Sequence, residues 1–118
     1  MKKLVLILFI FIFLTTGISC TSKEVRYQKG RYEGLGEGHH GPIKVMVETD
    51  EYKVIAIEVI EEYEMPELSS IVYDKIPKRV LKMNNAEVEV VAGATYTSKG
   101  LIEAIEDAIE KAEIKEEQ

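Results

Sequence analysis

The C-terminal third of the chain contains a long amphipathic stretch, and this feature constrains the fold more than any other. From Ser98 onward, apolar residues recur at helical spacing while Glu and Lys fill the opposite face. The apolar positions are Leu101, Ile102, Ile105, Ala108, Ile109 and Ala112. A continuous stripe of this kind is typical of a helix that packs one face against the rest of a domain. The sequence therefore predicts a C-terminal helix that packs on elements upstream.

Three segments before this helix have the features of β-strands. Arg31 to Gly41 reads as a first strand that runs into a glycine-rich loop, with glycines at positions 34, 36, 38 and 41. From Ile43 to Val47, apolar residues alternate with other types, as in a half-buried strand. A further β-rich segment follows the turn "TDEYK", so residues 43–62 are expected to form a hairpin.

A second helical pattern begins at Glu67 and continues to Leu81. Pro77 lies inside it and is expected to kink or divide that helix, because proline removes a backbone donor. After the turn "NNAE", residues 88–91 are expected to form one more short strand. The predicted order is β-β-β-α-β-α, an antiparallel sheet with helices packed on one face, which belongs to the α+β class.

The first 19 residues have the pattern of a secretory signal peptide. Two lysines precede an unbroken apolar run from Leu4 to Leu14, and small residues follow it. The run of 11 residues is too short for a spanning helix, which needs about 20. We therefore expect residues 1–19 to be a leader rather than a membrane span.

Cys20 is the only cysteine in the chain, so it cannot form an intramolecular disulfide. The sequence "GISC" that ends at Cys20 resembles a bacterial lipobox, in which the cysteine is acylated and becomes the first mature residue. Ser19 fits this pattern, whereas Gly17 stands where leucine is usual. The resemblance implies lipidation at Cys20, a polar tether over residues 20–30, and a location at the outer face of the cell membrane. The alternatives are an uncleaved anchor or an ordinary signal peptide followed by a spare thiol.

The charge of the chain argues against one class of partner. It carries 15 Lys and Arg against 21 Asp and Glu, a net charge of −6, and two of the lysines fall in the leader. Nucleic-acid binding requires clusters of basic residues that neutralise phosphates. No nucleic-acid partner is therefore expected.

The stretch "GATYTS", residues 93–98, places three hydroxyl side chains where the C-terminal helix begins. The first N–H groups of a helix lack partners and attract anions such as phosphate. Thr97 or Ser98 can cap such a helix, and Gly93 allows a positive φ or a close approach of backbone to a ligand. From the residues alone, Thr95 and Thr97 can equally be turn and cap residues without a ligand.

Several segments together resemble the FMN-binding domain family, found in small bacterial lipoproteins and in flavin-bearing subunits of ion-pumping membrane reductases. These segments are "YQKGRYEGLGEG", "GPIKVMV", "VIAIEVIEE" and "VVAGATYTSKGLIEAIEDAIEKA", and the resemblance covers Tyr27 to Ala112. The family motif is Asp, two variable residues, Ser or Thr, Gly, Ala, Thr or Ser, any residue, and a final Thr or Ser. A flavin transferase attaches FMN to that final hydroxyl through a phosphoester.

The resemblance implies FMN as the cofactor and Thr97 as its attachment residue. It also implies that the surrounding residues bind the cofactor, namely Gly93, Ala94, Thr95, Tyr96 and Ser98. Two positions depart from the motif, since Glu89 replaces Asp and Ala92 replaces Ser or Thr. Ala92 lacks a hydroxyl that could bind the phosphate or the transferase, and a lost neutral hydrogen bond is worth about 0.5–1.5 kcal/mol. The departures therefore weaken the predicted site without abolishing it.

A second segment of the family, commonly Glu-Thr-Pro-Gly, lies against the flavin ring. Here it corresponds to Glu64, Met65, Pro66 and Glu67, of which Glu64 and Pro66 match. The resemblance implies that Glu64, Met65 and Pro66 contribute to the cofactor site, where the Met65 thioether can pack on an aromatic ring. The alternative is an ordinary acidic loop after a strand.

His39 and His40 raise the question of a metal site with Glu37. Adjacent histidines on a flexible loop rarely point at one ion, and the sequence offers no further histidine to complete a tetrahedral set. We expect no metal, and we expect this loop to lie near the cofactor or at the surface.

Taken together, the residues and the resemblance predict a signal peptide (1–19), a lipid-anchored tether (20–30) and an FMN-binding domain (31–118). The expected function is a membrane-tethered, extracytoplasmic flavoprotein that relays electrons from a membrane reductase. Its expected partners are a flavin transferase, that reductase and membrane lipid. No catalytic triad, carboxylate pair or nucleotide loop is evident, so an electron-transfer component is favoured over a stand-alone enzyme. The alternative is a surface binding or regulatory lipoprotein that keeps the fold without flavin.

Overall fold

The fold is built on a three-stranded antiparallel sheet. The computed structural model describes residues 24–115, and β1 (Gly30–Glu37), β2 (Pro42–Thr49) and β3 (Val54–Glu61) lie in that order across the sheet. β1 pairs with β2 along its whole length, and the pairing of β2 with β3 shifts register near each end. The predicted hairpin is therefore confirmed. The predicted signal peptide and Cys20 lie outside the described residues.

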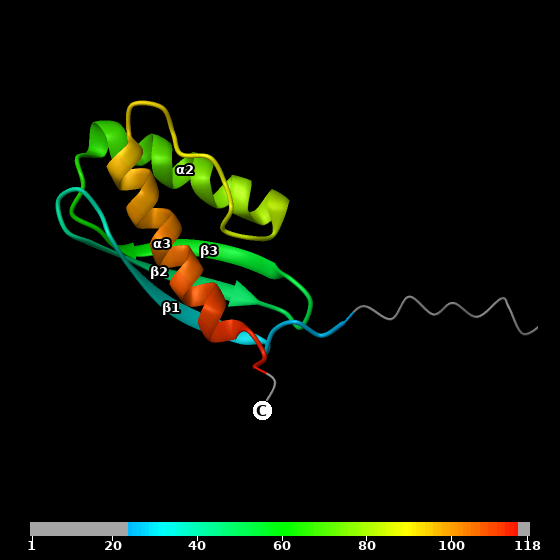
Figure 1. Ribbon diagram of the computed structural model, residues 1–118. Helices are drawn as coiled ribbons and strands as arrows, with labels where there is room; N and C mark the ends of the chain where they lie inside the picture. The colour runs from blue at the N-terminus through cyan, green and yellow to red at the C-terminus, as the bar shows by residue number, and fades with distance from the viewer. Residues whose placement is uncertain (1–23, 116–118) are drawn as a thin grey trace, which may run out of the picture.

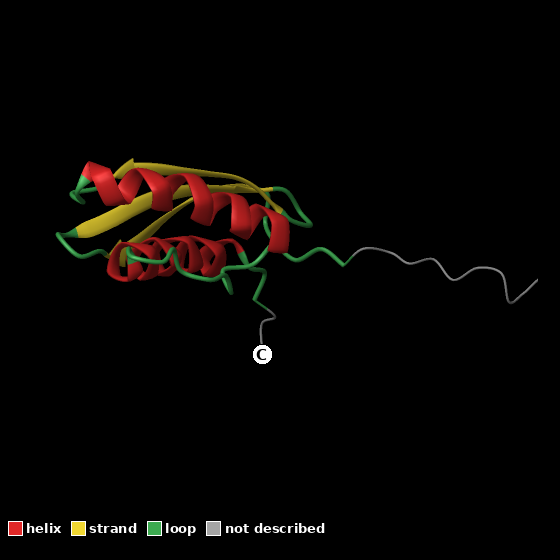
Figure 2. Ribbon diagram, turned by 90° about the horizontal axis from the view of Figure 1, so that it is seen from above, coloured by secondary structure: helices red, strands yellow, loops and turns green. Residues whose placement is uncertain are grey.

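Two helices of 18 residues complete the domain, α2 (Pro66–Met83) and α3 (Thr95–Ala112). α3 packs across β1 and β2, whereas α2 runs beside β3 and packs against α3 (Figure 1). Figure 2 shows α3 on one side of the strands. The α+β class and the antiparallel sheet are confirmed, with the order β-β-β-α-α. Within residues 24–115, no helix is long and apolar enough to cross a membrane.

The strand expected at residues 88–91 is wrong, because this segment forms an irregular loop between the two helices. Its backbone groups are bound by side chains rather than by a neighbouring strand. Arg79 Nη1 donates to the carbonyl oxygen of Glu89 over 2.7 Å, and the Val91 N–H donates to Ser98 Oγ over 3.0 Å. The segment thus satisfies these backbone groups without joining an edge of the sheet.

Pro77 was expected to kink or divide the second helix, and the division is wrong, since α2 runs without interruption from Pro66 to Met83. A proline removes one backbone donor from a helix and strains its preceding turn. Here the residues on either side of Pro77 are anchored in the core, because Val72, Ile76 and Val80 are fully buried. Their packing keeps the helix continuous through the proline.

The core lies between α3 and the inner face of the sheet, with α2 closing one side. Every second residue of β2 points into it, beginning with Ile43, Val45 and Val47, all fully buried. The predicted apolar stripe of the C-terminal helix faces these side chains, and Leu101, Ala104 and Ile105 are fully buried as well. The apolar residues that alternate along β2 and those that recur at helical spacing in α3 thus pack against each other in one core.

Two glycines of β1 let α3 approach the sheet closely. A Cβ atom at Gly34 would lie 1.9 Å from the Ala104 carbonyl oxygen, and one at Gly36 would lie 2.0 Å from the Gly100 carbonyl oxygen. No side chain fits at these distances. β1 therefore continues through two glycines of the glycine-rich segment, and the loop begins only at Gly38.

The beginning of the described chain is bound to the end of α3. Tyr27 is 1% exposed and pairs with Glu113 in an antiparallel bridge, while the Gln28 N–H donates to the Ala112 carbonyl over 2.9 Å. Figure 1 shows this start, in blue, next to the red C-terminal end. Folded contacts therefore begin within the segment that the sequence assigns to the tether.

Candidate functional site

A pocket of about 240 Å³ opens at the N-terminal end of α3. Five of the residues that the sequence assigned to the cofactor line it together, namely Gly93, Ala94, Thr95, Tyr96 and Thr97. Two further lining residues, His39 and Leu68, come from the loop after β1 and from the first turn of α2. Three segments far apart in the sequence thus meet at this point.

The turn before α3 lines the pocket and leaves its backbone accessible there. The Ala94 N–H donates to the Val91 carbonyl over 3.0 Å, and Gly93 has a φ of 84°, as the third position of a type II turn requires. The positive φ predicted as one option for Gly93 is confirmed. No atom lies within 4 Å of a Cβ built at Gly93, so backbone is accessible to a ligand there.

α3 begins at Thr95, three residues earlier than the sequence pattern suggested. The expectation that Thr97 or Ser98 caps it is wrong, because both lie inside the helix and the N-cap residue is Ala94, which forms no side-chain cap. The first turn also contains no acidic residue. The positive end of the helix therefore meets the pocket without a side-chain acceptor, which suits an anion.

The three hydroxyl side chains have different environments. Ser98 is fully buried, and its Oγ accepts the Val91 N–H, so it holds the turn against the helix. Thr95 is exposed. Thr97 is 6% exposed and lines the pocket, and its hydroxyl makes no hydrogen bond within residues 24–115. Among the described residues, every fully buried side-chain nitrogen or oxygen atom has a hydrogen-bond partner. The Thr97 hydroxyl has none in this part of the chain, so it is not fully buried, and we place it at the surface of the pocket that Thr97 lines.

Aromatic rings form one wall of the pocket. The His39 and Tyr96 rings stack with centroids 5.4 Å apart and planes inclined by 25°, and Tyr96 is 70% exposed. The His40 ring meets the edge of His39 with centroids 4.5 Å apart. The expectation that this loop lies near the site holds for His39. Flat side chains in this position can pack against a planar ligand.

The second predicted segment adjoins the pocket without lining it. The Glu64 carboxylate is buried and accepts the N–H groups of His39 and His40, the latter over 3.0 Å. Met65, 51% exposed, precedes α2, and Pro66 is the first residue of that helix. The Met65 carbonyl accepts the N–H of Leu68, the residue that reaches the pocket, over 3.1 Å. Leu68 and His39 carry no motif signal, because chain folding alone brings them to the site.

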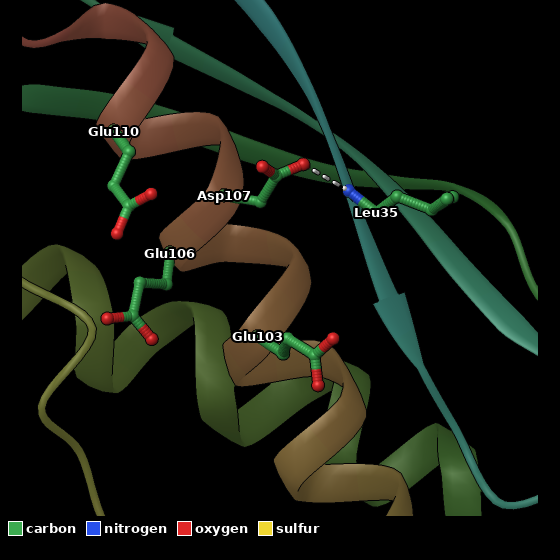
Figure 3. Close-up of a pocket in the computed structure, with 5 residues that line it drawn as sticks. All are labelled: Leu35, Glu103, Glu106, Asp107 and Glu110. Carbon is green, nitrogen blue, oxygen red and sulfur yellow. Dashed lines mark hydrogen bonds between the residues drawn. The ribbon is translucent and has the colours of Figure 1, made fainter.

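A larger hollow of about 580 Å³ lies elsewhere, between β1 and the outer face of α3 (Figure 3). Leu35 and four carboxylates line it: Glu103, Glu106, Asp107 and Glu110. An anionic lining of this kind repels a phosphate, so the smaller pocket is the better cofactor site despite its size. Within residues 24–115, no group of three or more His, Cys, Asp or Glu side chains is arranged to hold a metal ion.

Comparison with known proteins agrees with this location. A family model described as the FMN-binding domain matches residues 38–110, which contain the whole pocket. A protein of Vibrio harveyi named NADH:acrylate oxidoreductase is 26% identical over 88 residues, covering 75% of this chain and 9% of that protein. An uncharacterized protein of Treponema pallidum (strain Nichols) is 24% identical over 92 residues, covering 78% of this chain and 25% of that protein. The chain thus spans a quarter or less of the length of these relatives.

Proposed function

The chain belongs to the FMN-binding domain family, and we propose that it is an extracytoplasmic electron carrier whose FMN is esterified to Thr97. The observation that carries the proposal is the pocket at the start of α3, which gathers the motif residues around the hydroxyl of Thr97. When bound, the isoalloxazine ring of FMN accepts and donates electrons.

The residues of the pocket fit both ends of FMN. The N–H groups at the start of α3 supply donors for the phosphate, and Gly93 leaves the backbone open beside them. Thr97 would provide the oxygen of the phosphoester and lose its hydroxyl proton, while the flavin transferase would supply an activated flavin donor whose bond from phosphorus to its leaving group breaks as the new ester forms. The rings of His39 and Tyr96 provide flat surfaces for the flavin ring. Ala92, which stands where the family has Ser or Thr, lies in the turn and is exposed. The N–H donors at the start of α3 therefore remain without that hydroxyl.

Electron transfer is supported by the family and by the similarity to a protein named as an oxidoreductase. That similarity covers 9% of the relative, so the reaction in its name is not carried over to this chain. A membrane reductase is the proposed electron donor, and a flavin transferase the proposed modifying partner.

The proposed lipid anchor at Cys20 gives the domain an orientation. The chain enters the fold at Tyr27, which pairs with Glu113 just beyond the C-terminal end of α3. The pocket lies at the other end of this 18-residue helix, about 27 Å away at 1.5 Å per residue. The flavin would therefore sit at the end of the domain opposite the point where the tether enters the fold.

Attachment is tested by producing the full chain together with a flavin transferase and examining it by denaturing electrophoresis. We expect a fluorescent protein band that is absent from Thr97→Ala and present in Thr95→Ala. A band that is lost only in Thr95→Ala would assign the phosphoester to the other hydroxyl. A colourless wild type under these conditions would instead favour a binding or regulatory lipoprotein that keeps the fold without flavin.

The anchor is tested separately with a labelled fatty acid. The label should enter the wild-type chain and not Cys20→Ala, because the thiol is the proposed site of acylation. Equal labelling of the two chains would remove the lipoprotein part of the proposal and leave flavin binding unaffected.

A further inference from the structure

Glu64 is the only Asp, Glu, Lys or Arg side chain among residues 24–115 that is buried, with 6% of its surface exposed. A buried carboxylate is costly unless hydrogen bonds replace its lost water. Here each oxygen has a partner, since Oε1 accepts the His39 N–H and Oε2 accepts the His40 N–H. Two successive backbone donors thus hold one carboxylate, as they would hold a bound anion.

The turn that supplies these donors is shaped around the carboxylate. The Gly38 N–H donates to the Gly41 carbonyl over 2.8 Å, which closes residues 38–41. A Cβ atom at Gly38 would lie 2.0 Å from Glu64 Oε1. Glycine at this position therefore allows the carboxylate to come this close to the turn.

The same turn carries the aromatic wall of the pocket. Once Glu64 fixes the backbone at His39, the imidazole is placed against the Tyr96 ring at the start of α3. Glu64 itself does not line the pocket, whereas His39 does. The hydrogen bond to the His39 N–H thus gives the carboxylate a direct route to the cofactor site through the position of His39.

We propose that Glu64 is a positioning residue for the flavin pocket, which acts by holding the His39 ring against Tyr96. This inference rests on the proposed FMN site. It assigns His39 as a further contact for the flavin and gives Glu64 a structural role in place of direct contact. It also leaves the N–H groups at the start of α3 as the donors for the phosphate, because Glu64 already occupies those of His39 and His40.

The most informative change is Glu64→Gln, which keeps the shape of the side chain. An amide has one acceptor oxygen, and its NH₂ group would face a backbone N–H, so two donors would oppose each other. The turn should then move and take His39 with it. Glu103→Gln is the matched control, because it removes one negative charge from an exposed position on α3.

The full chain is produced without a flavin transferase, and its FMN affinity is measured from the quenching of FMN fluorescence. The same variants, produced with the transferase, are compared by the visible circular dichroism of the attached flavin. Glu64→Gln should weaken FMN binding by about tenfold, the effect expected for one charge-assisted hydrogen bond. It should also reduce the flavin dichroism, whereas Glu103→Gln should match the wild type in both measurements.

The route through His39 is tested by combining changes. His39→Ala should lose as much affinity as Glu64→Gln, and the double variant should lose no more than His39→Ala alone. His39→Phe keeps a ring against Tyr96 and should retain affinity for FMN. The two His39 variants test the aromatic side of the pocket even if Glu64→Gln does not fold. Additive losses, or a Glu64→Gln chain that binds like Glu103→Gln, would overturn the inference while leaving FMN binding intact. A wild type that neither binds nor attaches FMN would overturn the proposed function as well.

Discussion

The backbone N–H of Leu35 donates a 3.0 Å hydrogen bond to Oδ2 of Asp107, which joins the outer edge of β1 to α3 (Figure 3). β1 is an edge strand, so its outward N–H and carbonyl groups have no neighbouring strand. Lys111 Nζ completes the arrangement by donating to the Glu33 carbonyl over 2.7 Å and to Asp107 over 3.2 Å. One helix thus covers the sheet and also caps its free edge.

Asp107→Asn should destabilise the domain by about 0.5–1 kcal/mol at neutral pH, since solvent weakens an exposed charge-assisted hydrogen bond. The Leu35 N–H, together with Lys111, holds the pKa of Asp107 below its ordinary value of 3.8. A lowered folded-state pKa gives stability that is present above 3.8 and is lost as the pH falls through the folded-state pKa.

Urea unfolding at pH 7 and at pH 3 measures this effect, and the difference between wild type and Asp107→Asn should shrink at the lower pH. Glu106→Gln removes a charge from an adjacent exposed position and should change stability by less than about 0.5 kcal/mol. A gap between wild type and Asp107→Asn that is equally wide at both pH values would show that charge is not involved.

Gly34→Ala should destabilise the domain by about 2–3 kcal/mol or more, because α3 must move away from β1 to admit the methyl group. The built Cβ lies 1.9 Å from the Ala104 carbonyl oxygen, which belongs to the helix backbone and cannot rotate away. Gly30→Ala is the control on the same strand, since its Cβ meets nothing closer than the Tyr32 hydroxyl oxygen at 3.4 Å. Thermal unfolding followed by circular dichroism compares them, and equal melting temperatures would refute the close-packing argument.

The sequence predicted the parts of the fold that depend on local pattern. Alternation in β2 and the apolar stripe of α3 are periodic over many residues, and both elements are confirmed. The error at residues 88–91 arose because β-branched residues show strand propensity but not whether an edge is free to pair. The start of α3 depends on the turn at Gly93 rather than on a cap residue, so its position could not be read from capping signals.

In the candidate site, too, the sequence predicted what depends on consecutive residues and missed what depends on tertiary packing. The motif around Thr97 was readable because its residues are consecutive and their types carry the chemistry. For His39 the sequence left two places open, near the cofactor or at the surface, and it did not single out Leu68. Both residues reach the pocket only through the packing of β1 and α2 around α3. The carboxylate of Glu64 matched the family pattern, yet its hydrogen bonds to the loop after β1 become visible only in three dimensions.

Ser98→Ala should destabilise the domain by about 1–3 kcal/mol, because the Val91 N–H would lose its acceptor in a buried site. Ser70→Ala, at an exposed position of α2, should change stability by less than about 0.5 kcal/mol. Denaturant unfolding of the two variants makes the comparison. A Ser98→Ala chain as stable as Ser70→Ala would mean that water or another group replaces the hydroxyl.

Gly93 allows backbone strain to be separated from access of the ligand. Gly93→Ala should cost about 1–2 kcal/mol, because a Cβ at a φ of 84° is strained even where no atom obstructs it. Asparagine tolerates a positive φ better than alanine, so Gly93→Asn should be the more stable of the two variants. Both variants place a side chain beside the start of α3, where the FMN phosphate is proposed to lie. FMN loading, measured as flavin absorbance per protein, should therefore fall in both, although their stabilities differ. Wild-type loading of Gly93→Asn would show that the position opens toward solvent and that the phosphate approaches the helix from another direction.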